Sequence, residues 1–302
     1  MARSLTLNDN EGAAAESAGG KRGFWRSRAV RTLLRDPWTV LGAVIVLLFV
    51  LMAIFAPWLA LYDPTLGNIL NRLQPPSAEH WFGTDGLGRD LLSRILYGAR
   101  LSAIVGFSAV ILSGAIGVFL GAVAGYYEGW TDTVVGRAVD TMLAFPGILL
   151  AILVLAVLGP GLTSVVIAVG IFGIPTYARV VRGTVLSVKR LDFVEASLAL
   201  GNSHPKILVR HVLRNSWAPV IVLTSLNFGT AVLTASALSF LGVGVQPPSP
   251  EWGAIIAEGR QYIRVAPHIT TITGIFIFAT VLGFNLLGDG LRDALDPRSQ
   301  DR

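Results

Sequence analysis

The chain contains several long apolar runs, each able to cross a lipid bilayer as a helix. A membrane-spanning helix needs about 20 mostly apolar residues, at a rise of about 1.5 Å per residue. Six segments meet this requirement: residues 38–62, 101–127, 134–158, 161–177, 215–241 and 265–287. A charge at the centre of the bilayer costs about 3 kcal/mol, and most of these segments contain none. The sequence therefore predicts an all-α integral membrane protein with six transmembrane helices.

Composition agrees with a membrane location and excludes several other classes. The 302 residues are 53% hydrophobic and 14% charged, whereas soluble domains carry about 25% charged residues. The absence of cysteine excludes disulfides and thiolate metal sites. The net charge of +5 would suit a nucleic-acid binder, but the basic residues lie between the apolar runs instead of on one face. We therefore expect contact with membrane lipid and no nucleic acid.

The distribution of basic residues predicts how the chain is oriented and divided. If residue 1 lies in the cytosol, 18 of the 24 Lys and Arg residues fall on the cytosolic side, as the positive-inside rule requires, and both termini are cytosolic. Residues 1–36 read as a largely disordered basic tail, since they carry little apolar mass. The first apolar run starts at Pro37, too late for a cleaved signal peptide. We expect 37–98 to hold the first helix and an outer loop, and 99–298 a five-helix core.

The sequence contains no motif typical of a catalytic, nucleotide-binding or metal-binding site. Its three lysines lie outside any glycine-rich phosphate loop, and its four histidines lack zinc-ligand spacing, so we expect no catalytic residue and no metal site. No carboxylate or histidine lies deep in a predicted span, as a proton-coupled carrier usually requires. An ion-coupled secondary carrier and a membrane scaffold without transport activity remain alternatives.

One polar connection, residues 184–214, has a helical pattern. Apolar residues recur at Leu191, Val194, Leu198 and Ala199, and Gly201 suits the left-handed position that ends a helix. We predict a short cytosolic helix over about 187–204, a glycine turn and a second helix. A helix this short is marginal in water and needs a surface. The pattern alone allows two surfaces, the lipid headgroups or a partner protein.

The same connection resembles a known signature. Glu195-Ala196-Ser197, followed by Gly201 and then His211-Val212-Leu213, is similar to the Glu-Ala-Ala…Gly…Leu-Pro signature of ABC importer permeases. Ser197 replaces the second alanine, and Arg214 stands where proline is common. The resemblance implies a coupling helix that docks into a cleft on the ATPase subunit. The implied docking residues are Leu191, Asp192, Phe193, Glu195, Ala196, Ser197, Leu198 and Gly201.

Other segments resemble the C-type permeases of the dipeptide, oligopeptide and nickel family. One is the Gly-Thr-Asp…Gly-Arg-Asp motif before the second span. Arg137 and Asp140 with Phe145-Pro146, residues 236–253 and residues 285–297 also match, so the resemblance runs from about residue 20 to 298. The outer motif comprises Gly83, Thr84, Asp85, Gly88, Arg89 and Asp90. We expect this motif to be a lid, a docking ledge for a substrate-binding protein, or a structured loop.

The resemblance implies a permease subunit of an ATP-driven importer, with an ABC importer (type I-like) fold, in the bacterial inner membrane. The implied partners are a second homologous permease, two cytosolic ATPases and an extracytoplasmic substrate-binding protein. ATP and Mg²⁺ would be bound by the ATPases, and this chain would bind no cofactor. Dipeptides or oligopeptides are the implied substrates, and nickel chelates or glutathione are alternatives.

Two further sets of residues carry predictions. Arg137 and Asp140 are three residues apart, which favours a structural ion pair on one helix face. Asn227, Thr230 and Thr234 form a polar face on the fifth span, which predicts a lining of the translocation path. Hydroxyls that bond to their own helix would produce the same pattern.

Overall fold

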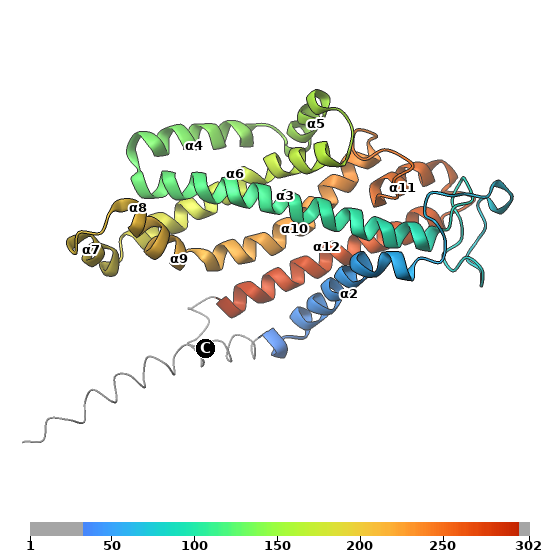
Figure 1. The fold of residues 1–302 in the computed structure, drawn as a ribbon, viewed down its shortest axis with the longest axis horizontal. Helices are drawn as coiled ribbons and strands as arrows, with labels where there is room; N and C mark the ends of the chain where they lie inside the picture. The colour runs from blue at the N-terminus through green and yellow to red at the C-terminus, as the bar shows by residue number, and fades with distance from the viewer. Residues whose placement is uncertain (1–32, 296–302) are drawn as a thin grey trace, which may run out of the picture.

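The computed structural model describes residues 33–295 as an elongated bundle of helices (Figure 1). Most of the predicted basic tail, residues 1–32, and the last residues, 296–302, lie outside the described part. Five helices are long and apolar enough to cross a membrane. They are α2 (Pro37–Leu59), α3 (Leu91–Tyr127), α6 (Leu162–Lys189), α10 (Trp217–Phe240) and α12 (His268–Leu295). These helices confirm five of the six predicted spans.

Two spans are longer than their apolar runs. Helix α3 begins at Leu91 instead of residue 101, because the Asp90 carboxylate caps it by accepting a bond from the Ser93 amide at 2.8 Å. Helix α6 continues to Lys189, past the end of the apolar run at residue 177. Its interior proline, Pro175, does not end the helix.

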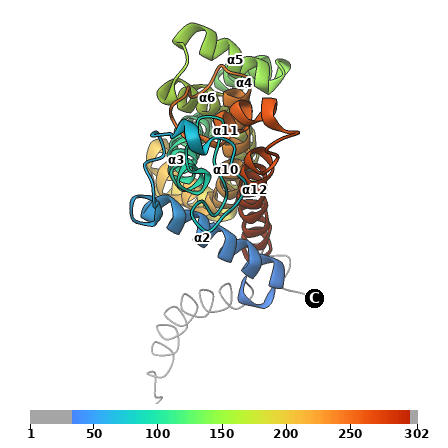
Figure 2. The ribbon, with the colours of Figure 1, turned by 90° about the vertical axis from the view of Figure 1, so that its right-hand side faces the viewer.

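The third predicted span, residues 134–158, is not one straight helix. It consists of α4 (Gly129–Ala144) and α5 (Gly147–Leu158), bent by 94° at the break between them. The break falls at Phe145-Pro146, where Phe145 is extended, since the ring of a following proline disfavours helical geometry. Counted as one broken span, the pair brings the total to six. Figure 2 shows α4 and α5 standing out from the rest of the bundle.

Glycines bring the long helices into close contact. Helices α3 and α6 form the most extensive helix pair in the described chain. A Cβ atom on Gly117 would lie 2.5 Å from the Tyr177 Cβ and 2.8 Å from the Ile174 carbonyl. Helix α2 approaches α12 in the same way at Gly42. Small residues therefore allow close helix packing within this one chain.

Shorter elements lie at the two ends of the bundle (Figure 1). One end, here called the α7 end, holds α7 (Asp192–Ala199), α8 (His204–Ile207), a π-helical turn (Leu208–Val212) and α9 (Leu213–Asn215). The other, here called the loop end, holds the 3₁₀ turn η1 (Ile69–Asn71), α11 (Trp252–Gly259) and the 3₁₀ turn η3 (Arg260–Tyr262). The candidate site residues are divided between these ends and the bundle that separates them.

Candidate functional site

Helix α7 forms where the sequence predicted a short helix. It ends before Gly201, whose φ of 77° is the left-handed geometry expected of a C-terminal glycine. Ser203 then precedes α8, which carries Pro205 in its first turn. The order of helix, glycine turn and second helix is as predicted, but α7 is shorter than the predicted 187–204: it covers Asp192–Ala199, and residues 187–189 belong to the end of α6.

The buried and exposed faces of α7 differ from the predicted apolar stripe. Val194 and Ser197 are buried against the bundle, whereas Leu191 and Leu198 are about half exposed. The Asn202 amide donates to both the hydroxyl and the carbonyl of Ser197 at 3.2 Å, which explains why a polar residue faces inward. Ser197 therefore anchors the helix instead of belonging to its outer surface.

The outer surface of α7 combines apolar and acidic side chains. Its exposed residues are Leu191, Asp192, Phe193, Glu195, Ala196 and Leu198. Gly201 has no atom within 4 Å of the position that a Cβ would occupy, so it is open as well. Phe193 and Leu198 are exposed on a helix that could have buried them, which is typical of a surface that a partner covers.

Behind α7 lies a polar cluster that the sequence did not predict. The Lys189 ammonium donates to the Tyr126 carbonyl at 2.6 Å and to the Glu128 carboxylate at 2.8 Å. The Tyr126 hydroxyl lies 3.0 Å from Nδ1 of His204. These side chains line a pocket of about 440 Å³ together with Val194, Glu195 and Leu198 of α7. The lysine bond lowers the pKa of Glu128, so this carboxylate stays ionised. No local motif joins residues so far apart in the chain.

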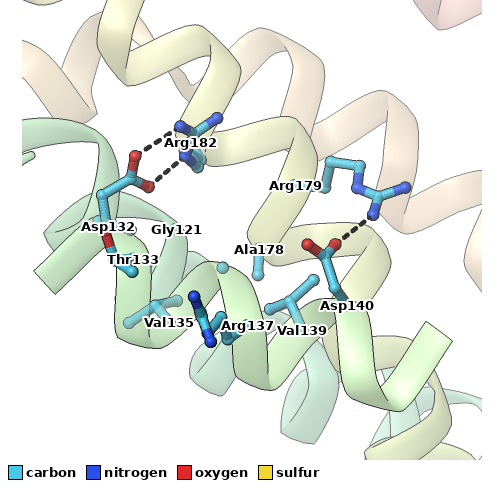
Figure 3. Close-up of a pocket in the computed structure, with 12 residues that line it drawn as sticks. Gly121, Asp132, Thr133, Val135, Arg137, Val139, Asp140, Ala178, Arg179 and Arg182 are labelled. Carbon is cyan, nitrogen blue, oxygen red and sulfur yellow. Dashed lines mark hydrogen bonds and ion pairs between the residues drawn. The ribbon is translucent and has the colours of Figure 1, made fainter. Parts of the chain in front are cut away.

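A second pocket, of about 340 Å³, lies between α3, α4 and α6 (Figure 3). Asp132 of α4 forms a two-point ion pair with Arg182 of α6. Asp140 of α4 accepts a bond from Arg179 of α6 at 2.9 Å. The predicted pair between Arg137 and Asp140 is therefore wrong in the described chain. The sequence could not reveal that α6 brings an arginine to Asp140 from another helix.

The predicted polar face on α10 is not one continuous lining. Thr234 is buried, Thr230 is exposed, and the Thr230 hydroxyl donates to the Leu226 carbonyl of its own helix at 3.3 Å. Asn227 is half-buried beside Ser113, and its Nδ2 atom is buried without a hydrogen-bond partner. Asn227 thus has a spare donor between α3, α6 and α10, whereas Thr230 is satisfied within its own helix.

The Gly-Thr-Asp…Gly-Arg-Asp motif folds as a buried structural network at the loop end. Asp85 Oδ1 accepts bonds from the backbone amides of Leu87 and Arg89, at 2.8 and 3.0 Å, and so closes the turn. Its other oxygen, Oδ2, pairs with the Arg89 side chain at 2.6 Å and lies 3.4 Å from Arg94. Gly83 and Gly88 take φ values of 79° and 74°, which favour glycine. Asp90 caps α3 and bonds His80 at 2.9 Å, and Thr84 bonds the Asn71 carbonyl.

A distant residue completes this network. Glu258 of α11 accepts from Arg89 at 2.7 Å and from Arg94 at 2.9 Å, and both arginines are almost fully buried. The network therefore fixes α11 to the start of α3. The roles of Glu258 and Arg94 were not predicted, because only the fold shows that the motif binds a carboxylate from another segment.

Five continuous apolar helices, a broken sixth span and a short exposed helix define a polytopic membrane protein. The comparisons with known proteins agree. The family described as "Binding-protein-dependent transport system inner membrane component" matches residues 117–301, and the "N-terminal TM domain of oligopeptide transport permease C" matches residues 23–76. The chain belongs to this family of inner-membrane components, the permease subunits of ABC importers.

Individual relatives cover nearly the whole chain. A dipeptide transport system permease protein, DppC, of Alkalihalophilus pseudofirmus is 49% identical over 274 residues, which are 91% of this chain and 90% of the relative. A glutathione transport system permease protein, GsiD, of Escherichia coli O6:K15:H31 is 48% identical over 276 residues, 91% of this chain and 89% of that protein. A solved structure of the MetNI methionine ABC transporter matches with a TM-score of 0.53 and 18% identity. That match covers 68% of this chain and 96% of the other, and it supports the fold.

Proposed function

We propose that this permease imports dipeptides or oligopeptides, with ATPase subunits docked on the exposed face of α7. The observation that carries the proposal is the α7 surface: a short helix at one end of the bundle with exposed Leu191, Phe193 and Leu198 around Glu195. The chain belongs to a family of ABC importer permeases and its sequence contains no phosphate loop, so ATPase partners would supply the energy for transport. Closure of the ATPases on ATP would move α7 and switch the transport path between its inward- and outward-facing states.

Peptide import is supported by the names of the relatives. One is named for dipeptide transport and another for glutathione, which is itself a small peptide. Uptake of labelled dialanine and of glutathione into proteoliposomes that contain the whole complex would decide between them. Glutathione uptake without dialanine uptake would contradict dipeptide import.

The proposed assembly contains a second permease, two ATPases and an extracytoplasmic binding protein, in a bacterial inner membrane. ATP and Mg²⁺ belong to the ATPases, so the purified chain alone should not hydrolyse ATP above background. Turnover that persists through further purification would contradict this assignment.

The proposed orientation places the α7 end in the cytosol and the loop end outside. The excess of Lys and Arg on the α7 side supports it. Reporter fusions after residues 30 and 298 should therefore report the cytosol, and fusions near Asn71 should report the outside. An outside signal after residue 30 would contradict the orientation.

Charge reversal on α7 tests the docking surface. Glu195→Lys places repulsion or an unpaired charge in a partly desolvated contact, which typically costs about 2–5 kcal/mol. At about 1.4 kcal/mol per tenfold, ATPase association should weaken by at least one decade. Gly201→Val should also weaken it, because a β-branched residue disfavours the left-handed turn.

The matched control is Glu79→Lys, the same reversal at an exposed position of the loop end. Co-purification of the ATPase subunits is the measurement, and the control should recover them normally. If α7 instead rests on lipid, Leu191→Asp should impair membrane association, and Glu195→Lys should be neutral near anionic headgroups. Normal ATPase recovery and normal transport in Glu195→Lys would exclude docking at this face.

A further inference from the structure

We propose that Tyr126, Glu128, Lys189 and His204 form a clamp that makes α7 and the α3–α4 turn move as one body. The proposal rests on ATPase docking at α7. Movement of the docked ATPase would then reach the bent pair α4–α5 directly, as well as along the chain into α6 and α10. The four residues are positioning residues, since none lies on the outer face of α7.

The contacts close a loop around the docking helix. Lys189 is the last residue of α6 and His204 is the first residue of α8, so they flank α7 on either side. Both bind the same tyrosine: the Lys189 ammonium donates to the Tyr126 carbonyl at 2.6 Å, and His204 Nδ1 lies 3.0 Å from the Tyr126 hydroxyl. The ammonium also lies 5.4 Å from the centre of the Tyr126 ring, within range of a cation–π attraction. The base of the docking segment is thus tied to the end of α3.

The clamp also holds a constrained turn. Glu128, between α3 and α4, has a φ of 54°, which is uncommon for a residue other than glycine, and Gly129 follows with a φ of 57°. Such a conformation persists where surrounding contacts hold it. Lys189 supplies one of these contacts through its 2.8 Å bond to the Glu128 carboxylate. The lysine therefore connects the docking segment with the residue that sets the direction of α4.

Few contacts hold helix α4 in place, so it can move together with this turn. Val139 is the one residue of α4 that is buried, and two ion pairs, Asp132–Arg182 and Asp140–Arg179, join α4 to α6. The second pair is mostly exposed, and exposed pairs add little stability. An element with few buried contacts reorients at low cost. The break at Pro146 would absorb the rotation before α5.

The absence of cysteine from the chain allows a direct test with spin labels. Cysteines replacing Trp130, at the start of α4, and Leu200, just after α7, place labels at exposed positions on either side of the clamp. Distances are measured by pulsed electron paramagnetic resonance in the assembled complex, without nucleotide and with ATP and vanadate. The clamp predicts one narrow distance that is the same in both states. A distance that shifts with nucleotide in this background would overturn the proposal.

The clamp is then weakened without touching the α7 surface. Tyr126→Phe removes the hydroxyl facing His204, and Lys189→Met removes both lysine bonds. Tyr127→Phe and Lys206→Met are the matched controls, since neither side chain makes a hydrogen bond within the described residues. The clamp variants should broaden or shift the distance and lower the dialanine imported per ATP hydrolysed by about threefold or more, whereas the controls should not.

Recovery of the ATPase subunits separates this proposal from the docking proposal. The clamp variants should recover them normally, because the outer face of α7 is unchanged. Loss of recovery in both variants would make the cluster a folding element and overturn the clamp, as would an unchanged distance in both. Failure of docking itself would appear with the clamp intact, as normal recovery of the ATPase subunits in the Glu195→Lys variant.

Discussion

Replacing Gly117 by alanine tests how closely α3 and α6 must pack. The added Cβ would lie 2.5 Å from the Tyr177 Cβ, 2.8 Å from the Ile174 carbonyl oxygen and 3.1 Å from the Ala178 amide nitrogen. Two of these three atoms belong to the backbone of α6, so no side-chain rotation can relieve the overlap. The helices must separate instead.

The expected cost follows from overpacking in well-packed cores. Inserting a methyl group where there is no room typically costs about 1–3 kcal/mol. Alanine also favours a helix over glycine by up to about 1 kcal/mol, which offsets part of that cost. At roughly 2–4 °C per kcal/mol, Gly117→Ala should lower the unfolding temperature by several degrees.

Gly114→Ala is the matched control, one turn earlier on the same helix. Its Cβ would lie 3.7 Å from the Tyr177 ring, an ordinary contact, so the helix preference acts alone and the unfolding temperature should stay the same or rise. The assay is thermal unfolding of the detergent-solubilised chain, followed by the loss of its monodisperse chromatographic peak. Equal unfolding temperatures for the two variants would refute the close packing of α3 on α6.

Three further changes test other parts of the structure. Glu258→Gln leaves the buried Arg94 without one of its two carboxylates and should cost about 3 kcal/mol, whereas Glu79→Gln, at an exposed site, should not change the unfolding temperature. Burial raises the pKa of Glu251, so the folded state favours the neutral carboxyl. The stability that this preference contributes is lost as pH rises through the raised pKa. In Glu251→Gln, the free energy of unfolding should therefore depend less on pH above about pH 4.5. Asn227→Leu removes a side chain whose buried Nδ2 atom has no hydrogen-bond partner, and it should change transport rate or selectivity with assembly intact. Unchanged transport of several substrates would make this position structural.

The sequence predicted the fold where local physical rules decide it. Long apolar runs need a bilayer, so the spans could be read directly, and the left-handed turn at Gly201 followed from glycine's conformational freedom. Pro146 disfavours helical geometry in the residue before it, but the size of the resulting bend could not be predicted. The 94° bend depends on how α4 lies against α6, a relation between segments that no local pattern encodes.

The candidate site was less predictable, because its contacts join distant residues. Spacing on one helix favoured a pair between Arg137 and Asp140, yet Asp140 binds Arg179 of α6. Ser197 was expected on the docking surface, but Asn202 satisfies it on the inner face of α7. Lys189 and Glu258 belong to no local motif, so their roles could not be predicted, although each binds groups far away in the chain.

The ion network at the loop end has a consequence for the order in which the protein is made. Arg89 and Glu258 are 169 residues apart, so the network stays open until the chain has been synthesised through α11. Asp85 emerges together with the two arginines and pairs with both, but it balances only one of their two charges. The cluster therefore stays hydrated until Glu258 arrives, since a buried unpaired charge is costly. The network can therefore close only after the membrane-spanning helices between α3 and α11 have been synthesised.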